Sequence, residues 1–520
     1  MFAPSLPRPL RHVAARCRQR PQQHFRHYAM HTKPAPTSAS MEPSTAALKT
    51  LNSDFDKLAP RFDVSASQIR ILESPSEFYS TLKAKILSAK RSVFLSTLYI
   101  GKEETEFIDT IREALRKNSQ LRVSILTDYL RGTRENPERS SATLLAELFK
   151  EFPKRVEVFM YHTPNLNGFK KQILPARINE GWGLQHMKLY GFDDEIMLSG
   201  ANLSDDYFTN RQDRYHLISS AEVTQYYRRI YNAVCKLSYG MALKGDRGEE
   251  AHLQWNTGSS TPNPITNSLK YIQSATKELT PLIRPFKRAQ NPDADTHIYP
   301  VFQFSPLLEP DRSTELTAMK VLLARLNTPG FAGSRWTFTA GYFNMTPEIR
   351  ERLLATNPVQ GTVIAASPWA NGFYGSKGVS GMLPAAYTHM AKQFLSAVSK
   401  LKLSNQIKLK EWRYGTVNEP GGWTYHAKGL WITLPKEKDP SITLIGSSNY
   451  TKRSYSLDLE ANALITTTNP ELKKRLGEEQ AWLQKHATEV TPTDYERTER
   501  RVGIHVRLAM WIVTLVGGAL

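Results

Sequence analysis

The chain has 520 residues, enough for two or more domains with a substantial hydrophobic core. Forty per cent of the residues are hydrophobic and 10% are aromatic, which excludes an intrinsically disordered protein. The formal net charge is +19, a surplus that favours anionic partners such as a lipid surface, a phosphate-bearing substrate or a nucleic acid.

The first 41 residues differ in composition from the rest of the chain. They contain six Arg, one Lys and no acidic residue, so a charge of +7 lies in this segment and +12 in the remainder. An acid-free, Arg-rich start with Ala, Ser and Pro is typical of a mitochondrial transit peptide, and the alternative is a basic disordered tail. No apolar segment follows the charges, which argues against a secretory signal.

In the first half, predicted helices alternate with predicted strands. Residues 34–45 have the composition of a linker, and Ser74-Pro75-Ser76-Glu77 has the pattern of a helix start. The hydrophobic pattern predicts helices at Phe78–Ala89, Thr105–Arg116 and Ala142–Phe152, and strands at Val93–Ile100, Leu121–Thr127 and Val156–Tyr161. This alternation is typical of a layered α/β domain.

A hairpin with an unusual set of polar residues follows these elements. His186 and Lys188 are two residues apart, so on a strand both side chains leave the same face. Asp193 begins a turn, and the returning strand ends at a small loop that contains Gly200 and Asn202. An imidazole, a fixed cation and neutral hydrogen-bond donors are the groups needed for chemistry at a phosphate diester.

The second half repeats the order of the first. A segment rich in Gly, Asn, Thr, Ser and Pro at 244–268 begins a predicted linker, so we expect domains at 46–243 and 296–500, joined by residues 244–295. The predicted strands are Ile298–Phe304, Trp336–Phe343, Thr362–Ala366 and Ile407–Trp412, and the predicted helices are Glu315–Leu326, one after Thr346-Pro347-Glu348, and Ala385–Val398. Ser96–Gly101 and Thr339–Asn344 occupy matching places in the two halves.

A second copy of the polar hairpin closes the repeat. His426 and Lys428 are again two residues apart, and the loop after the returning strand contains Ser447 and Asn449. Eleven residues beyond each loop Asn stands an acid, Asp213 in the first copy and Glu460 in the second. A single His-x-Lys pair is usually a surface strand, whereas two copies with matching downstream residues indicate a site.

The motif His186, Lys188, Asp193, Gly200 and Asn202 resembles the signature of the phospholipase D superfamily, His-x-Lys-x4-Asp followed by a Gly/Ser-rich turn and Asn. The second copy departs from it because Thr433 replaces the Asp. In the superfamily that Asp is mainly a structural partner, so the departure affects packing more than chemistry. The resemblance implies an α/β fold of two phospholipase D-like α/β/α sandwich halves, related by internal duplication, with one shared active site.

The resemblance also implies roles for these residues. The acid that orients each imidazole comes from the other half, which pairs His186 with Glu460 and His426 with Asp213. By analogy His186 attacks phosphorus and holds the transferred group covalently, and His426 acts as the general acid and base. The two motif lysines and Asn202 with Asn449 would neutralise the nonbridging oxygens, so no metal and no other cofactor is expected.

Cysteine usage agrees with a site that contains no metal. The chain has only Cys17 and Cys235, and Cys17 lies in the expected transit peptide. The remaining thiol cannot form an internal disulfide, and no cluster of residues has the spacing of metal ligands.

An aromatic, Gly-rich loop at 368–378 has no counterpart in the first half. It contains Asn371 and Lys377, and we predict that it binds substrate together with Gly200, Ser447 and the two motif asparagines. The alternative interpretation is a flexible surface turn.

A narrower resemblance covers roughly residues 60–490. The basic start, Tyr425–Trp431 and Ser456–Ala461 are similar to the eukaryotic phosphatidylglycerophosphate synthases. That family implies CDP-diacylglycerol and glycerol 3-phosphate as substrates, release of CMP, and a peripheral or monotopic place on the anionic inner mitochondrial membrane, with no nucleic acid as a partner. The alternatives are a phospholipase D-type phosphodiesterase or nuclease, which the charge of +12 would suit, and a non-catalytic basic membrane-binding scaffold.

The C-terminal segment 501–520 is apolar from Val506 onward, apart from Arg507. From Leu508 it runs for thirteen residues, fewer than the roughly twenty that a membrane-spanning helix needs. We expect it to enter one leaflet, with arginines such as Arg507 at anionic headgroups, and the alternative is a core or oligomer-forming helix. The sequence does not indicate an oligomeric state.

Overall fold

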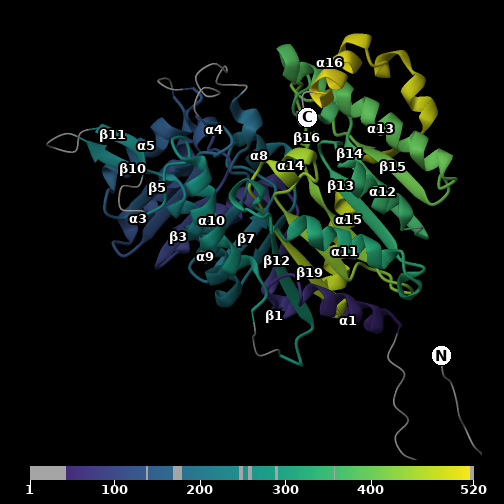
Figure 1. Ribbon diagram of the computed structural model, residues 1–520, viewed down its shortest axis with the longest axis horizontal. Helices are drawn as coiled ribbons and strands as arrows, with labels where there is room; N and C mark the ends of the chain where they lie inside the picture. Colours follow the sequence, from purple (N-terminus) through teal and green to yellow (C-terminus); the bar gives the residue numbers. More distant parts are fainter. Residues whose placement is uncertain are drawn as a thin grey trace, which may run out of the picture. The chain divides into compact units, whose positions relative to one another are not determined.

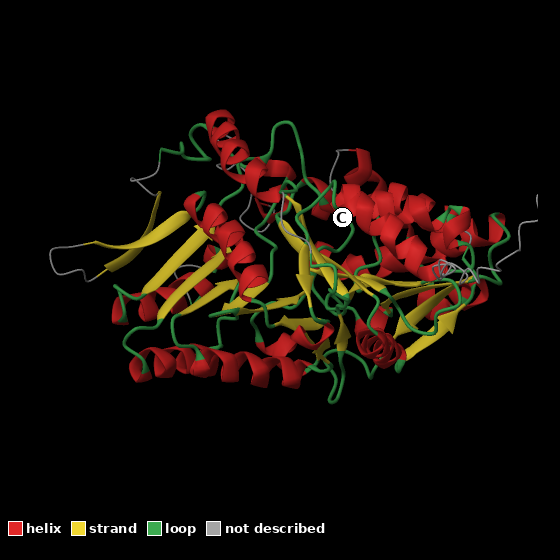
Figure 2. Cartoon of the chain, turned by 90° about the horizontal axis from the view of Figure 1, so that it is seen from below, coloured by secondary structure: helices red, strands yellow, loops and turns green. Residues whose placement is uncertain are grey.

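A computed structural model of the chain describes residues 43–135, 139–167, 179–244, 250–255, 260–286, 291–356 and 358–515. The expected transit peptide lies outside these ranges. Within them the strands form two nine-stranded mixed sheets and one two-stranded ribbon, and helices cover both faces of the sheets (Figure 1, Figure 2). The predicted α/β fold with two duplicated halves is confirmed.

The first sheet has the strand order β11-β10-β5-β4-β3-β6-β7-β9-β2, in which β3, β4 and β5 are parallel. Its strands are β2 (Ile69–Leu72), β3 (Ser92–Ser96), β4 (Arg122–Asp128), β5 (Val156–Tyr161), β6 (Leu189–Phe192), β7 (Glu195–Ser199), β9 (Tyr215–Ile218), β10 (Tyr239–Lys244) and β11 (Glu250–Trp255). Its helices are α2 (Pro75–Ser88), α3 (Thr105–Lys117), α4 (Tyr129–Thr133), α5 (Ser141–Glu151), α8 (Asp205–Thr209), α9 (Ala221–Lys236) and α10 (Ser268–Ile283).

The second sheet has the order β1-β12-β19-β18-β17-β13-β14-β15-β20. Its strands are β1 (Phe62–Val64), β12 (Thr296–Gln303), β13 (Arg335–Ala340), β14 (Gln360–Ala366), β15 (Ile407–Trp412), β17 (Lys428–Thr433), β18 (Ile442–Gly446), β19 (Glu460–Thr467) and β20 (Ala487–Val490). Its helices are α1 (Pro43–Phe55), α11 (Glu315–Leu326), α12 (Pro347–Ala355), α13 (Leu383–Lys400), α14 (Lys452–Ser456), α15 (Pro470–Gln484) and α16 (Ile504–Leu515).

Alternating side chains divide each sheet between two hydrophobic layers. In β3, Val93 and Leu95 join α2, α3 and α5 in one cluster, whereas Phe94 joins α9 and α10 in another. The second cluster also contains Trp431 of β17 and Leu476 of α15. The two halves therefore share one continuous core, and they are not separate domains joined by a flexible linker.

The domain boundaries differ from the predicted ones at both junctions. Strand β1 pairs antiparallel with β12, and Leu51 of α1 packs with Tyr299 in the core of the second half, although residues 46–64 were assigned to the first. The predicted linker contains β11, which extends the first sheet beside β10, and α10, which enters the shared core. Strands β1 and β11 thus extend the edges of the two sheets, and helices α1 and α10 cover parts of their faces.

One arginine crosses between the halves. The Arg214 guanidinium lies between β8 (Arg211–Gln212) and β9 and forms two 2.9 Å hydrogen bonds with the carboxylate of Glu479 on α15. It also donates to the Leu444 carbonyl at 2.8 Å and stacks 3.8 Å from the ring of Trp431. Because Arg214 is fully buried, this ion pair fastens the two sheets together where the motifs meet.

The C-terminal helix α16 lies beside α13 (Figure 1). Its side chains Ile504, Leu508 and Trp511 are 82%, 53% and 59% exposed. Among the helices of the described ranges, none is long and apolar enough to cross a membrane.

Candidate active site

Backbone pairing brings the two motifs together. Gln185 forms a parallel bridge with Leu459, and the His186 amide donates to the Leu459 carbonyl at 3.0 Å. In the other half, β16 (Thr424–Tyr425) runs parallel to β8, and the His426 amide donates to the Gln212 carbonyl at 2.8 Å. Each motif histidine is thus held by the residue that immediately precedes the acid of the opposite half.

The side chains complete this crosswise arrangement. His186 Nδ1 lies 3.0 Å from both carboxylate oxygens of Glu460, and His426 Nδ1 lies 2.7 Å from Asp213 Oδ2. These are the two contacts that the resemblance implies, and all four residues are buried. An Nδ1–H that donates to a carboxylate leaves the lone pair of Nε2 free for attack or proton transfer.

Both motif lysines are buried next to these pairs. Lys188 Nζ donates to the His186 carbonyl at 2.7 Å. Lys428 Nζ lies 3.0 Å from Asp213 Oδ2 and 3.3 Å from the Gly200 carbonyl, so it also spans the two halves. Two buried ammonium groups so close to two imidazoles provide the positive charge that a phosphate diester requires.

The loops after the hairpins supply polar groups and space. Asn202 Nδ2 donates to the Tyr207 hydroxyl at 3.2 Å, and among the described residues neither Asn202 Oδ1 nor Asn449 Oδ1 has a hydrogen-bond partner. Most buried polar atoms in proteins have a hydrogen-bond partner, so an exception calls for an explanation. In these two loops we expect the explanation to be a ligand that binds the free oxygens. The matching positions Gly200 and Ser447 differ, because Gly200 lets Lys428 approach whereas the Ser447 hydroxyl donates to Glu460.

Burial sets the protonation of the histidine–carboxylate pairs. It lowers the pKa of His186 and of His426 well below the ordinary value, with the adjacent lysines acting in the same direction. Burial raises the pKa of Glu460 to about 7, against the opposing charge of Lys188. Burial opposes ionisation of Asp213 too, but Lys428 and His426 keep its pKa below the ordinary value. The imidazoles are therefore neutral near pH 7, as a nucleophile and a general base must be.

Burial also lowers the pKa of Lys188 to about 7 and lowers that of Lys428. A buried ammonium with a low pKa regains its charge when an anion binds beside it. The site is therefore suited to an anionic ligand.

Three further residues surround His426, and the sequence motifs did not indicate them. The Tyr207 hydroxyl lies 3.4 Å from His426 Nε2, and the Tyr342 ring meets the imidazole edge-on at a centroid distance of 5.2 Å. The Arg211 guanidinium stacks 4.6 Å from the centre of the Tyr207 ring. The available signals were the matching positions of Tyr99 and Tyr342 in the two halves and the place of Arg211 two residues before Asp213.

Asp193 lies away from the histidines. Its carboxylate accepts hydrogen bonds from the backbone amides of Lys90, Arg91 and Ser92 at 2.7–2.9 Å. It occupies the turn between β6 and β7, ~16 Å along an extended strand from Lys188. Asp193 therefore links the turn of the hairpin to the start of β3 through hydrogen bonds.

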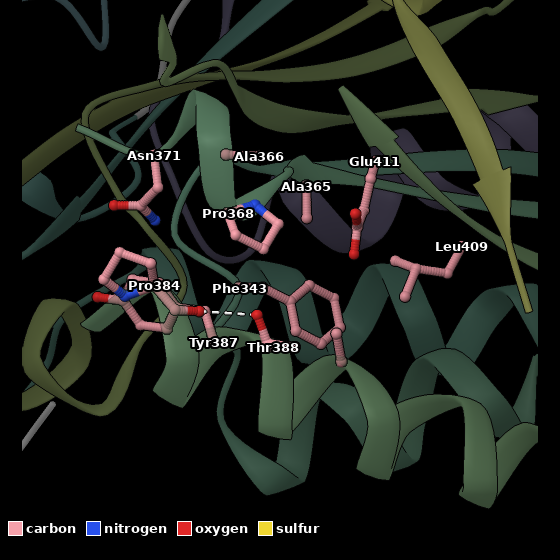
Figure 3. A pocket seen from close by; sticks show the side chains of 11 residues that line it. Phe343, Ala365, Ala366, Pro368, Asn371, Pro384, Tyr387, Thr388, Leu409 and Glu411 are labelled. Atoms are coloured by element: carbon pink, nitrogen blue, oxygen red, sulfur yellow. Dashed lines mark hydrogen bonds between the residues drawn. The ribbon is translucent and has the colours of Figure 1, made fainter. Parts of the chain in front are cut away.

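The loop at 368–378 contributes one buried and one exposed polar residue. Asn371 is buried and lines a small pocket, whereas Lys377 is exposed. Figure 3 shows Asn371 and Tyr387 at one end of this pocket and Leu409 and Glu411 at the other. The space for water in it is about 10 Å³, room for roughly one molecule, so it is too small for a substrate.

A larger cavity of about 380 Å³ lies next to the motif loop of the first half. Its lining includes Tyr99, Arg131, Ser204 and Asp206, and the Tyr99 hydroxyl is 3.4 Å from Ser204 Oγ. Across the described part of the chain, no group of three or more His, Cys, Asp or Glu side chains is placed to hold a metal ion.

Comparisons with known proteins agree with this geometry. Residues 82–235 match the family described as "Cardiolipin synthase, PLD-like domain". The solved structure of phosphatidylserine synthase from Haemophilus influenzae shares the fold, with a TM-score of 0.69, 20% identity, and coverage of 90% of this chain and 97% of that one.

Curated relatives extend the match over nearly the whole chain. The chain is 45% identical to the CDP-diacylglycerol–glycerol-3-phosphate 3-phosphatidyltransferase of Saccharomyces pastorianus, over 91% of this chain and 93% of the relative. It is 36% identical to the human enzyme of that name, which is designated mitochondrial, over 87% and 83% of the two chains. The chain therefore belongs to the CDP-diacylglycerol–glycerol-3-phosphate 3-phosphatidyltransferase family of the phospholipase D superfamily.

Proposed function

We propose that this protein transfers the phosphatidyl group of CDP-diacylglycerol to glycerol 3-phosphate, releasing CMP and forming phosphatidylglycerophosphate. The observation that carries the proposal is the crosswise pairing of His186 with Glu460 and of His426 with Asp213. This pairing puts two neutral imidazoles and two buried ammonium groups at one site. The family membership supplies the identity of donor and acceptor.

In the first half-reaction, His186 Nε2 attacks the phosphorus that carries diacylglycerol. A P–N bond forms while the P–O bond to CMP breaks, and His426, which takes up a proton on Nε2 when the anionic donor binds beside it, gives that proton to the departing oxygen. The Glu460 carboxylate stabilises the positive charge that develops on the His186 ring. The two lysines and the two motif asparagines stabilise the charge on the nonbridging oxygens.

In the second half-reaction, the primary hydroxyl of glycerol 3-phosphate attacks the same phosphorus. His426 Nε2 takes the hydroxyl proton as the new P–O bond forms and the P–N bond breaks. The Asp213 carboxylate, 2.7 Å from His426 Nδ1, fixes the tautomer needed for this step. His186 is then free for another donor molecule.

The direct test supplies the purified protein with CDP-diacylglycerol and a panel of acceptors: water, glycerol, glycerol 3-phosphate, serine and phosphatidylglycerol. We expect efficient CMP release with glycerol 3-phosphate and identification of phosphatidylglycerophosphate by mass spectrometry. A product formed only from water, or only from serine or phosphatidylglycerol, would overturn the proposal.

The histidine roles are tested separately. His186→Ala and His426→Ala should each lower turnover by more than the ~10²–10⁴ typical of one acid–base group, because each histidine acts in both half-reactions. With donor alone, an acid-labile phosphatidyl adduct should form on His186 in the wild type and be absent in His186→Ala. An adduct mapped to His426 would exchange the two roles.

We also propose that α16 docks on the anionic inner mitochondrial membrane. Ile504, Leu508 and Trp511 follow one another at spacings of four and three residues, so they share one exposed helix face, and Arg507 can meet lipid phosphates. Helix α16 packs beside α13, and the Tyr387 ring of α13 stacks at 5.8 Å on Tyr342 next to His426. The membrane-facing helix thus lies near the site that receives a lipid donor.

Flotation with vesicles that contain cardiolipin or phosphatidylglycerol tests this docking. Replacing Leu508 and Trp511 with Ser should abolish binding, whereas Leu401→Ser, at a comparably exposed apolar residue next to α13, should not change it. Unchanged flotation of the α16 variant would refute the assignment. A fluorescent protein fused behind residues 1–41 tests mitochondrial targeting, which the designation of the human and other mammalian relatives supports.

A further inference from the structure

The two halves carry ion pairs of opposite polarity at matching positions. Four and nine residues after Asn202 stand Asp206 and Arg211, and at the same distances after Asn449 stand Arg453 and Asp458. Each pair forms a salt bridge of 2.8 Å. The bridge links a short helix, α8 or α14, to the segment that precedes the carboxylate partner of a motif histidine, Asp213 or Glu460. The order of acid and base is reversed, so the charges break the approximate twofold symmetry of the site.

The two pairs also differ in the exposure of their acids. Asp458 is 5% exposed, binds Arg453 through both carboxylate oxygens and accepts the Leu184 amide at 2.9 Å. Asp206 is 56% exposed, whereas the side chain of Arg211 is only 12% exposed. A buried guanidinium whose counterion is in solvent keeps most of its attraction for another anion, since water screens the exposed carboxylate.

Arg211 lies on the side of the site that belongs to His426. Its Nε donates to Thr424 Oγ1 at 2.9 Å, two residues before His426, and its guanidinium stacks on Tyr207, whose hydroxyl faces His426 Nε2. Against its other side lies Gly372, where an added Cβ would be 3.0 Å from Arg211 Nη2. The Tyr207 ring thus lies between the Arg211 guanidinium and the His426 imidazole.

Space for a small polar molecule adjoins this arginine. Asp206, its ion-pair partner, lines the cavity of about 380 Å³ together with Ser204 and Tyr99. The rest of the lining includes four more carboxylates, Glu103, Glu104, Glu135 and Asp205, and the cations Lys102 and Arg131, so an acceptor phosphate is repelled from most of the cavity and is favoured at its edge beside Arg211. Glycerol 3-phosphate is smaller than this volume, and it carries its phosphate at the opposite end of a three-carbon chain from the attacking hydroxyl.

We propose that Arg211 binds the phosphate group of the acceptor and thereby selects glycerol 3-phosphate over neutral alcohols. With the hydroxyl at His426 Nε2, the acceptor phosphate lies three carbons away. The Tyr207 ring separates the two groups that would hold these ends, with the Arg211 guanidinium 4.6 Å from its centre and the His426 ring centre 5.2 Å from it. A guanidinium fits a phosphate through paired, charge-assisted hydrogen bonds, and the acceptor phosphate displaces Asp206 towards solvent. The inference rests on the proposed function and adds to it a residue for acceptor specificity.

The test compares kcat/KM for glycerol 3-phosphate and for glycerol, with CDP-diacylglycerol as donor and CMP release as the signal. Arg211→Gln should lower kcat/KM for glycerol 3-phosphate by about ten- to hundredfold, mainly through KM, and should lower the value for glycerol by a much smaller factor. Arg211→Lys, which keeps the charge and loses the paired geometry, should give an intermediate loss.

Asp206→Asn is the matched control because it breaks the same ion pair from its exposed side. If Arg211 binds acceptor phosphate, this variant should keep or improve the KM for glycerol 3-phosphate. Equal losses for both acceptors in Arg211→Gln, or the same loss in Asp206→Asn, would overturn the inference and make the ion pair structural. Melting temperatures of all variants check folding. A wild-type protein that uses neither acceptor would instead contradict the proposed function.

Discussion

The substitution Gly200→Ala tests how closely the two halves must approach at the active site. A Cβ at this position would lie 2.6 Å from Asp213 Oδ1 and closer still to Lys428 Nζ, whereas ordinary contacts begin at 3.4 Å. The Asp213 carboxylate would therefore have to move by about 0.8 Å, the difference between these two distances. Both neighbouring groups are ends of side chains, so the protein can accommodate the methyl group without unfolding.

The displacement should nevertheless affect chemistry, because Asp213 and Lys428 hold His426. A misplacement of about 1 Å in a catalytic group can lower the rate by ~10²-fold, so we expect kcat to fall about a hundredfold in Gly200→Ala. CMP release at saturating donor and acceptor measures kcat, and thermal unfolding checks that the fold persists. Gly330→Ala, where an added Cβ meets no atom within 4 Å, is the control. A Gly200→Ala enzyme with wild-type kcat would refute the close approach of the halves.

Four further predictions concern charged residues. Arg214→Met should lower the free energy of unfolding by about 3–5 kcal/mol, because the buried Glu479 loses its guanidinium partner and keeps only the contacts with His216 and Trp431, and urea unfolding measures this loss. Burial alone would raise the pKa of Glu479, but Arg214 and His216 hold it below the ordinary 4.5. This stabilisation is therefore complete above pH 4.5 and is lost as the pH falls further, so stability should depend less on acid pH in Glu479→Gln. Since the pKa of Glu460 is raised to about 7, kcat should fall as the pH drops below that value, when protonation removes the acceptor for His186 Nδ1; an identical acid limb in Glu460→Gln would assign it to another group. Asp193→Asn should lower stability by about 1–3 kcal/mol while kcat changes little, and a hundredfold loss of kcat would place Asp193 in the chemistry instead.

The regular elements of the fold could be predicted because their information is local. The helix Glu315–Leu326 and the strand Ile407–Trp412 have the predicted bounds, since amphipathic spacing and flanking polar residues mark both ends. The place of β1 could not be predicted in this way. It is a three-residue strand that pairs with residues 296–298, and no local pattern encodes so distant a partner.

The residues of the site fall into the same two groups, those marked by a local sequence pattern and those placed by long-range packing. The motif histidines, lysines, asparagines and acids were visible because they recur at fixed spacings in two copies. Arg211, Tyr207 and Tyr342 were not visible, because their closeness to His426 depends on how the halves pack. The ion pair of Arg214 with Glu479 joins residues 265 positions apart, and a single sequence carries no sign of such a contact.

The anchoring of each motif histidine to the opposite half constrains when activity can appear during biosynthesis. Until the ribosome has added Leu459 and Glu460, His186 lacks both its backbone partner and its carboxylate, and the core that the two halves share is incomplete. Under the proposed mechanism, a nascent or prematurely terminated polypeptide therefore has no complete site, since it lacks the carboxylate that orients His186.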